Sequence, residues 1–199
     1  MTEIWAVRID RALTRRQEQF AMHLLPPARQ RRIENTRRRA EPLCAYAALL
    51  LALKKTVRWN RLPEIVLSAA GKPSFPGFPE VCFNLSHTDG AVLAGVSPLS
   101  LGVDIEKIRP MNPEAMRRLA GETEPDAFFR RWVFREALVK RDGSGFRALM
   151  EKHTPDDPLY RAFEPFPGYA AGAAMSGGGE FVLHCCTADA LLGELTEIL

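Results

Sequence analysis

Leu101-Gly102-Val103-Asp104-Ile105-Glu106 is the stretch that decides the fold, because apolar and polar side chains alternate along it. A period of two predicts a strand with an apolar face towards the core. The opposite face carries Gly102, Asp104 and Glu106. Two carboxylates beside a residue with no side chain leave room for a cation and a ligand. A solvated sheet edge would show the same pattern, so both interpretations stand.

The segment Trp132-Val133-Phe134-Arg135-Glu136-Ala137-Leu138-Val139-Lys140 also places charges inside apolar sequence. Apolar side chains cover most of the circumference of the helix predicted here, which should therefore be buried on several sides. Glu136 and Lys140 share one stripe, where an exposed ion pair would contribute only about 0.3–0.5 kcal/mol. The alternative is a walled cleft. If this helix meets the strand at 101–106, three carboxylates could hold one hard cation.

Outward from these segments, the chain alternates short strands and helices. Strands are predicted at residues 4–9, 64–68, 81–85, 91–96, 101–106, 169–175 and 180–186. Helices are predicted at 14–25, in the arginine-rich segment, at 42–53, from 112, at 125–140 and at 189–197. The glycines at 177–179 are predicted to form a hairpin turn. This order predicts an α+β protein built as α/β two-layer halves, residues 1–98 and 99–199, in one compact unit.

The composition excludes several classes of protein. The chain has 199 residues, 46% of them hydrophobic, so it can form a core and should not be disordered. A net charge of +3, from 27 basic and 24 acidic residues, does not indicate wholesale nucleic-acid binding. The arginines nevertheless cluster at positions 29, 31, 32, 37, 38 and 39. They form a solvated helix face or a site for a phosphate or an acidic protein, and without interleaved aromatics they favour nucleic acid less.

The cysteines, the N-terminus and the apolar runs predict a cytoplasmic location. The four cysteines show no CxxC spacing, which argues against a zinc site or a disulfide framework. Reduced thiols fit a cytoplasmic protein. The first residues lack the basic flank and apolar core of a signal peptide. The longest apolar run, near residues 45–53, is too short to span a bilayer.

Phe83-Asn84-Leu85-Ser86-His87 ends a predicted strand with a hydroxyl and an imidazole. Ser86 and His87 could be half of a hydrolase site, but no GxSxG elbow surrounds the serine. An imidazole beside backbone N–H groups suits phosphate binding equally well. Lys72, in a Gly-Lys-Pro turn, is a further candidate phosphate contact or an ordinary exposed lysine.

Four motifs together resemble those of the 4′-phosphopantetheinyl transferases, specifically the longer surfactin-synthetase-activating type. They are Gly71-Lys72-Pro73, Phe83-Asn84-Leu85-Ser86-His87, Gly102-Val103-Asp104-Ile105-Glu106 and Trp132-x-x-Arg135-Glu136-Ala137-x-x-Lys140. Each motif is common by itself. Four of them in the family's order, between residues 71 and 140, make a specific match.

The resemblance implies a fold and a set of ligands. It implies two similar subdomains related by a pseudo-twofold in one monomer, with coenzyme A bound in the cleft between them. Asp104, Glu106 and Glu136 would hold Mg²⁺, for which Mn²⁺ could substitute because the ligands are all oxygen. The groups expected to contact coenzyme A are basic or hydroxylated: Lys72, Ser86 and His87 at its adenosine and phosphates, Lys140 at the pyrophosphate, and Arg29 and Arg32 at the 3′-phosphate.

The implied activity is transfer of the 4′-phosphopantetheine group from coenzyme A to a serine of an acyl or peptidyl carrier protein. Glu136 would take the serine proton, and Lys140 would stabilise the departing adenosine 3′,5′-bisphosphate. One alternative is a coenzyme A-binding module without transfer activity, and another is a nucleic-acid-binding protein that uses the arginine cluster.

Three features depart from the family's pattern. The arginine that the family carries early in the first long helix has no clear equivalent, because Ala40-Glu41-Pro42 falls near that place, directly after Arg37 to Arg39. Arg135 stands where the family usually has lysine, which keeps the charge but changes its geometry. The segment between Glu106 and Trp132 is shorter than in familiar members, and it belongs to the surface expected to meet the carrier protein.

Overall fold

The computed structural model describes residues 1–150, 156–177 and 179–199, and it has the mixed α+β architecture that the sequence predicts. Its elements, in chain order, are β1 (Thr2–Arg8), α1 (Arg15–His23), α2 (Pro27–Glu34), α3 (Ala40–Val57), β2 (Val66–Leu67), β3 (Pro73–Ser74), β4 (Cys82–Thr88), β5 (Ala91–Ser97), β6 (Leu101–Lys107), α4 (Pro113–Ala120), α5 (Pro125–Asp142), α6 (Phe146–Leu149), β7 (Tyr160–Phe163), β8 (Tyr169–Met175), β9 (Phe181–Thr187) and α7 (Ala188–Ile198).

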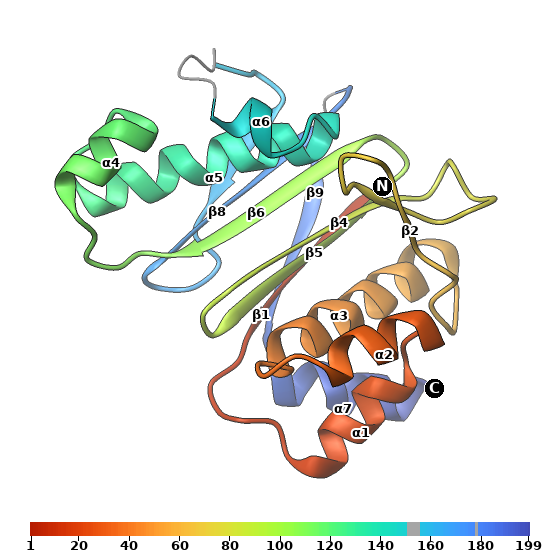
Figure 1. Ribbon diagram of the computed structural model, residues 1–199. Coiled ribbons are helices and arrows are strands. Elements are labelled where there is room, and N and C mark those ends of the chain that lie inside the picture. Colours follow the sequence, from red (N-terminus) through yellow and green to blue (C-terminus); the bar gives the residue numbers. More distant parts are fainter. Residues whose placement is uncertain (151–155, 178) are drawn as a thin grey trace.

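The strands form two main sheets. The first has the order β4-β5-β1-β9, in which β1 runs antiparallel to β5 and parallel to β9. The second has the order β6-β8-β7 and is antiparallel. Figure 1 shows that β9 and α7, from the end of the chain, lie with the first sheet and its helices. The end of the chain therefore joins the first half, across the boundary predicted near residue 98.

The predicted hairpin between the last two strands is wrong. β8 pairs with β6 and β7, whereas β9 pairs with β1 in the other sheet. The chain between β8 and β9 therefore crosses from one sheet to the other instead of turning back within one. Of the glycines predicted to form the turn, Gly178 lies outside the described residues.

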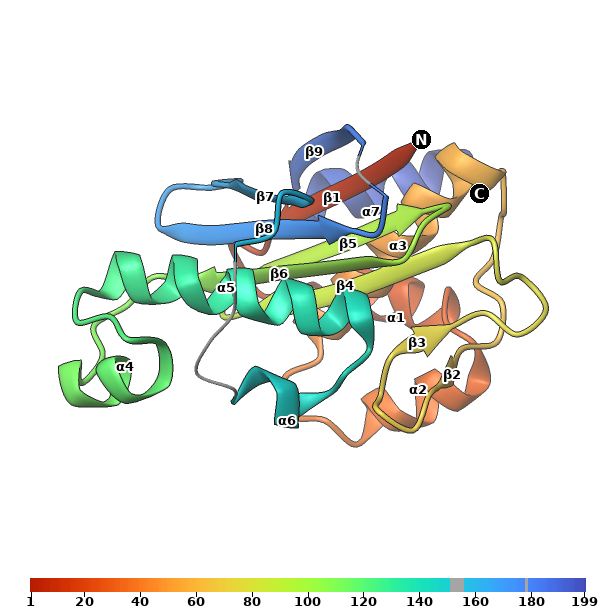
Figure 2. The ribbon, with the colours of Figure 1, turned by 90° about the horizontal axis from the view of Figure 1, so that it is seen from above.

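The two sheets pack face to face, and each has helices on its outer side (Figures 1 and 2). In β1, Trp5 and Val7 face the core beneath α1–α3 and α7, while Ile4 and Ala6 face the core between the sheets. Phe129 and Ala137 of α5 pack on the outer face of the second sheet. Both faces of β1 are thus buried, which explains its nearly continuous apolar sequence.

Each sheet is covered by one long helix, α3 for the first and α5 for the second, and each of these helices has 18 residues. This correspondence fits the expectation of two similar halves. A pseudo-twofold axis relating them stays a prediction.

The contact between β6 and α5 depends on a glycine. A Cβ built on Gly102 would overlap the carbonyl oxygen of Ala137 and the backbone nitrogen of Arg141. The backbone of α5 therefore fills the space beside Gly102, and the prediction that a cation and a ligand would occupy that space is wrong. The close approach places α5 directly against β6 (Figure 2).

β4 and β6 lie side by side where the two sheets meet, and polar side chains join them in place of backbone pairing. Alternate residues of β4 accept hydrogen bonds from alternate N–H groups of β6: Val103 to Asn84 Oδ1 (3.0 Å), Ile105 to Ser86 Oγ (3.4 Å) and Lys107 to Thr88 Oγ1 (3.3 Å). We call these three contacts the β4–β6 seam. They satisfy buried donors that no neighbouring strand reaches.

Several element boundaries differ from those predicted. Ser86 and His87 lie within β4 and not at its turn, because pairing with β5 continues to Thr88. The strand predicted at 64–68 is reduced to β2, and α2 takes in only the first three arginines of the cluster. Capping of α1 by Thr14 is confirmed by a capping box with Gln17. Among the described helices, none has the length and apolar character needed to cross a bilayer.

Candidate active site

One ammonium group joins the strand β6 to the helix α5. Lys140 Nζ lies 2.5 Å from Asp104 Oδ1 and 3.2 Å from Glu136 Oε2. It also donates to Ser86 Oγ at 3.1 Å, and Ser86 donates to Asp104 Oδ1 at 2.6 Å. The two charged segments of the sequence therefore meet in space, and a serine from β4 completes their contact.

Asp104 is the buried centre of this cluster. It is 2% exposed, and its Oδ2 has no hydrogen-bond partner among the described residues. A buried carboxylate is costly unless a cation compensates it. Burial by itself lowers the pKa of Lys140, but Asp104 and Glu136 outweigh burial and raise that pKa. Lys140 therefore stays charged and acts as the counter-ion of Asp104.

Glu136 lies beside the same ammonium. Burial and the neighbouring Asp104 carboxylate raise the pKa of Glu136, although Lys140 and a hydrogen bond from Trp132 act in the opposite direction. A carboxylate whose pKa is raised towards neutrality is a stronger base than an exposed one. Glu136 thus has the character of a proton acceptor.

The structure does not bring Glu106 into this cluster. Its Oε2 accepts hydrogen bonds from Thr88 Oγ1 at 3.0 Å and from Arg109 at 3.2 Å. Within the described parts of the chain, no three His, Cys, Asp or Glu side chains lie close enough to share a metal ion. The carboxylates that converge are Asp104 and Glu136, while Glu106 lies on the same face of β6 with other partners.

The cluster is nevertheless suited to a small, hard cation. Asp104 and Glu136 already share one positive charge, and Asp104 Oδ2 offers a buried oxygen that makes no hydrogen bond to the described residues. Oxygen donors of this kind are the ones that Mg²⁺ and Mn²⁺ prefer. The residues present therefore fit a dication, which Asp104 and Glu136 would hold.

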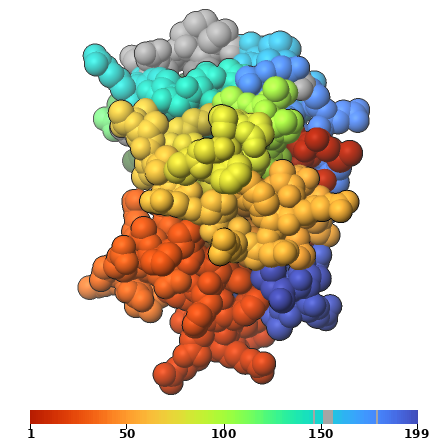
Figure 3. Space-filling view, turned by 90° about the vertical axis from the view of Figure 1, so that its right-hand side faces the viewer, coloured from red at the N-terminus to blue at the C-terminus, as the bar shows by residue number. Residues whose placement is uncertain are grey.

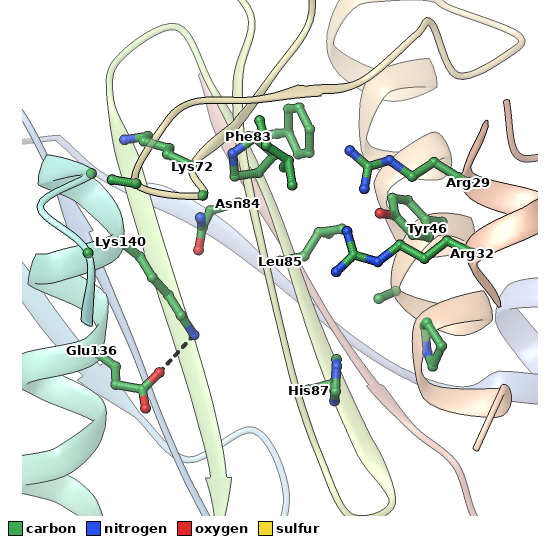
Figure 4. A pocket seen from close by; sticks show the side chains of 18 of the residues that line it. Arg29, Arg32, Tyr46, Lys72, Phe83, Asn84, Leu85, His87, Glu136 and Lys140 are labelled. Atoms are coloured by element: carbon green, nitrogen blue, oxygen red, sulfur yellow. Dashed lines mark ion pairs between the residues drawn. The ribbon is translucent and has the colours of Figure 1, made fainter. Parts of the chain in front are cut away.

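Beside the cluster lies a cavity of about 720 Å³ between the helices of the first half and α5. Figure 4 shows Arg29, Arg32 and Tyr46 on the helical side and Lys140 and Glu136 on the opposite side. His87 and other β4 side chains form the wall between these sides. The ionisable side chains that line the cavity, tyrosine apart, are Arg29, Arg32, Arg38, Lys72, His87, Glu136 and Lys140.

Three predicted residues make other contacts. Lys72 lines the cavity, but its ammonium is bonded to Ser100 Oγ and to the carbonyl of Arg141. Ser86 is buried against Asp104 instead of facing the cavity. Arg135 is 3% exposed and donates to the carbonyls of Leu119 and Leu149, at the ends of α4 and α6. It braces α5 against these two helix ends.

Two residues at the site were not predicted to belong to it. Tyr46 was expected on the core face of α3, but it lines the cavity. Its hydroxyl, within the apolar middle of that helix, is the signal in the sequence. Asn84 had no assigned role within its motif, yet it begins the β4–β6 seam. Its signal was a polar side chain two residues before Ser86 and four before Thr88, on one face of the strand.

Several known proteins with similar sequences are 4′-phosphopantetheinyl transferases. The chain is 25% identical to the 4′-phosphopantetheinyl transferase Sfp of Bacillus subtilis (strain 168) over 202 residues, which cover 84% of this chain and 89% of the relative. It is 33% identical to the 4′-phosphopantetheinyl transferase AcpT of Escherichia coli O157:H7 over 134 residues, which cover 60% of this chain and 66% of that relative.

A shorter match is to the 4′-phosphopantetheinyl transferase ffp of Bacillus subtilis, 27% identical over 129 residues, which cover 50% of this chain and 57% of the relative. No protein-family model matches the chain. The similarity to Sfp runs over most of both chains, and the four motifs occur in the family's order. The chain belongs to the 4′-phosphopantetheinyl transferase family.

Proposed function

We propose that the protein transfers the 4′-phosphopantetheine group of coenzyme A to a serine hydroxyl of an acyl or peptidyl carrier protein and releases adenosine 3′,5′-bisphosphate. One observation carries the proposal: a single cavity has arginines on one side and the Lys140–Glu136 pair on the other. A polyanionic nucleotide could therefore meet cations at one end and a base at the other. The similarity to Sfp supports the same reaction class.

The phosphates of coenzyme A would be bound by the cationic side of the cavity. Arg29, Arg32 and His87 line it and come from two separate elements, α2 and β4. Guanidinium groups suit phosphate because their planar donors bind it in pairs. We assign Arg29 and Arg32 to the 3′-phosphate and His87 to the phosphates near β4. Lys72 belongs to the cavity wall, and its ammonium is already bonded to Ser100.

The reacting atoms would lie at the other side, near Lys140 and Glu136. Lys140 carries a charge that can stabilise the phosphate leaving the pyrophosphate. Glu136 would accept the proton of the carrier serine while the serine oxygen attacks the phosphorus. Ser86 would hold Asp104 in place through its 2.6 Å hydrogen bond.

Asp104, Glu136 and Glu106 would hold Mg²⁺, which when bound supplies charge neutralisation at the pyrophosphate. Glu106 would have to leave Arg109 and Thr88 to join the other two carboxylates. The buried, unpartnered Asp104 Oδ2 supports this assignment. The Lys140 ammonium would then be free to turn towards the phosphates.

The reaction is tested by mixing the protein with an apo-carrier protein, coenzyme A and Mg²⁺ and measuring the intact mass of the carrier. A gain equal to the phosphopantetheine arm supports the proposal. No gain on several acyl and peptidyl carriers, with coenzyme A still bound, would instead support a binding module. Salt-dependent binding to random duplex DNA without affinity for coenzyme A would support a nucleic-acid-binding protein.

A further inference from the structure

Lys72 joins the loop before β3 to the end of α5 through its ammonium group. Lys72 Nζ donates to Ser100 Oγ at 2.6 Å, and both Lys72 and Ser100 donate to the carbonyl of Arg141, the serine at 2.6 Å. Lys72 lies in the loop before β3, Ser100 precedes β6, and Arg141 lies in the last turn of α5. Three separate parts of the chain therefore meet at one carbonyl oxygen.

The loop that carries Lys72 is itself held in place. The N–H of Ser68 donates to the Lys72 carbonyl at 2.9 Å, and the N–H of Lys72 donates to Ser68 Oγ at 3.1 Å. A Cβ built on Gly143 would lie 3.2 Å from Cδ of Lys72, so the lysine stem packs on the end of α5. Figure 3 shows the yellow segment that contains this loop against the cyan segment that follows α5.

The carbonyl that Lys72 binds needs a partner. The last four carbonyls of a helix have no partner within it, and they carry its negative partial charge. In α5 the N–H groups of Gly143 and Ser144 both return to Val139, which leaves the carbonyl of Arg141 to other donors. An ammonium from outside the helix satisfies this carbonyl and opposes the dipole. Burial lowers the pKa of Lys72, in keeping with an ammonium held away from water.

We propose that Lys72 is a positioning residue, which with Ser100 holds the last turn of α5 so that Lys140 and Glu136 keep their places beside Asp104. Lys140 directly precedes Arg141, and Glu136 lies on the same stripe one turn earlier. The inference rests on the proposed function, since the positions of these two groups matter for transfer. It replaces the direct contact with coenzyme A that the family resemblance implies for Lys72.

Ser100 distinguishes the two roles, because it does not line the cavity yet shares the same carbonyl. If Lys72 positions α5, Lys72→Met and Ser100→Ala should both lower kcat, the first about tenfold, while coenzyme A affinity measured by calorimetry changes less than about twofold. If Lys72 binds coenzyme A, Lys72→Met should weaken that affinity and Ser100→Ala should have no effect. The second result would overturn the proposal.

A measurement without ligands separates failure of this inference from failure of the proposed function. Hydrogen exchange at the amides of Gly143 and Ser144 reports the last turn of α5, because both amides bond to Val139. We expect about tenfold faster exchange there in Lys72→Met and a smaller increase in Ser100→Ala, since both weaken a helix end. A protein that neither binds coenzyme A nor modifies carriers would contradict the proposed function, and this exchange would still decide the role of Lys72.

The matched control is Lys54→Met. Lys54 lies on α3, bonds Asn60 at 2.5 Å and is not part of the cavity lining. It should leave kcat, coenzyme A affinity and exchange in α5 unchanged. Unchanged exchange at Gly143 and Ser144 in both Lys72→Met and Ser100→Ala would overturn the positioning role, and Ser100→Ala alone decides it if Lys72→Met does not fold.

Discussion

Asp104 carries the most deeply buried charge of the candidate site. It is 2% exposed, and its counter-ion Lys140 lies 2.5 Å away. Removing one member of a buried pair leaves the other charge uncompensated, at a cost of about 3–5 kcal/mol. We expect Asp104→Asn to lower the free energy of unfolding, measured with urea, by about 3 kcal/mol.

Asp126→Asn is the control for this loss. Asp126 pairs with Arg130 at 2.7 Å on α5, but both side chains are exposed, at 58% and 46%. Solvent screens such a pair, so its removal should change stability little. Equal losses in the two variants would contradict the role of Lys140 as a buried counter-ion.

Glu136 should determine how the reaction rate depends on pH. The carboxylate is the active form of a base, and burial together with Asp104 raises the pKa of Glu136 above its ordinary value. Because kcat/KM reports the free enzyme, before metal and substrate bind, kcat/KM should rise with pH through that raised pKa and fall as pH is lowered through it. We expect Glu136→Gln to lose about 100-fold in kcat and to lose this limb of the profile.

Glu124→Gln, at the start of the same helix, should keep both the rate and the profile. Coenzyme A affinity measured without Mg²⁺ should survive in Glu136→Gln, because the substitution leaves the arginine side of the cavity intact. A Glu136→Gln profile that matches the unsubstituted protein would rule out Glu136 as the base.

At the scale of elements, the contact of β6 with α5 depends on Gly102. A Cβ there would overlap backbone atoms of Ala137 and Arg141, which cannot move aside as a side-chain end can. We expect Gly102→Ala to destabilise the protein by about 1–3 kcal/mol, measured by urea unfolding, and to separate α5 from β6.

Gly193→Ala is the matched substitution within α7. No atom lies within 4 Å of a Cβ built on Gly193, and alanine is the better helix former. This variant should gain about 0.5–1 kcal/mol. A Gly102→Ala variant as stable as Gly193→Ala would contradict the close packing of α5 on β6.

The alternation at 101–106 was enough to predict both faces of β6. Leu101, Val103 and Ile105 lie in the core between the sheets, and Asp104 and Glu106 lie on the other face. Burial of one face of a strand requires apolar residues at every second position, so the alternation can be recognised in the local sequence. The helix α5 was predictable for the same reason, because apolar residues surround most of its circumference.

The partners of these elements were not predictable in the same way. β9 pairs with β1, although the two strands lie near opposite ends of the sequence. Nothing within residues 180–186 distinguishes that pairing from a hairpin with β8. Glu106 shares a face with Asp104 but bonds Thr88 and Arg109, because side chains two apart on a strand reach different neighbours. Such choices depend on tertiary packing, which local periodicity does not encode.

For the whole molecule, metal and coenzyme A should bind cooperatively. Lys140 occupies the space between Asp104 and Glu136, so Mg²⁺ must displace a cation that the polyanionic substrate would attract. Each ligand should therefore raise the affinity of the other by the same factor, about fivefold or more. Calorimetric titration of Mg²⁺ with and without coenzyme A measures this coupling. Equal affinities for Mg²⁺ in the two titrations would contradict cooperative binding.

The proposed reaction is transfer of the phosphopantetheine group of coenzyme A to a carrier serine in this cavity. The most direct measurement counts adenosine 3′,5′-bisphosphate released and holo-carrier formed in the same reaction, with the unsubstituted protein and with Glu136→Gln. We expect equal amounts of both products with the unsubstituted protein and a far slower reaction with Glu136→Gln. The proposed reaction would be contradicted if the unsubstituted protein formed neither product although coenzyme A and Mg²⁺ were bound and several apo-carriers were supplied.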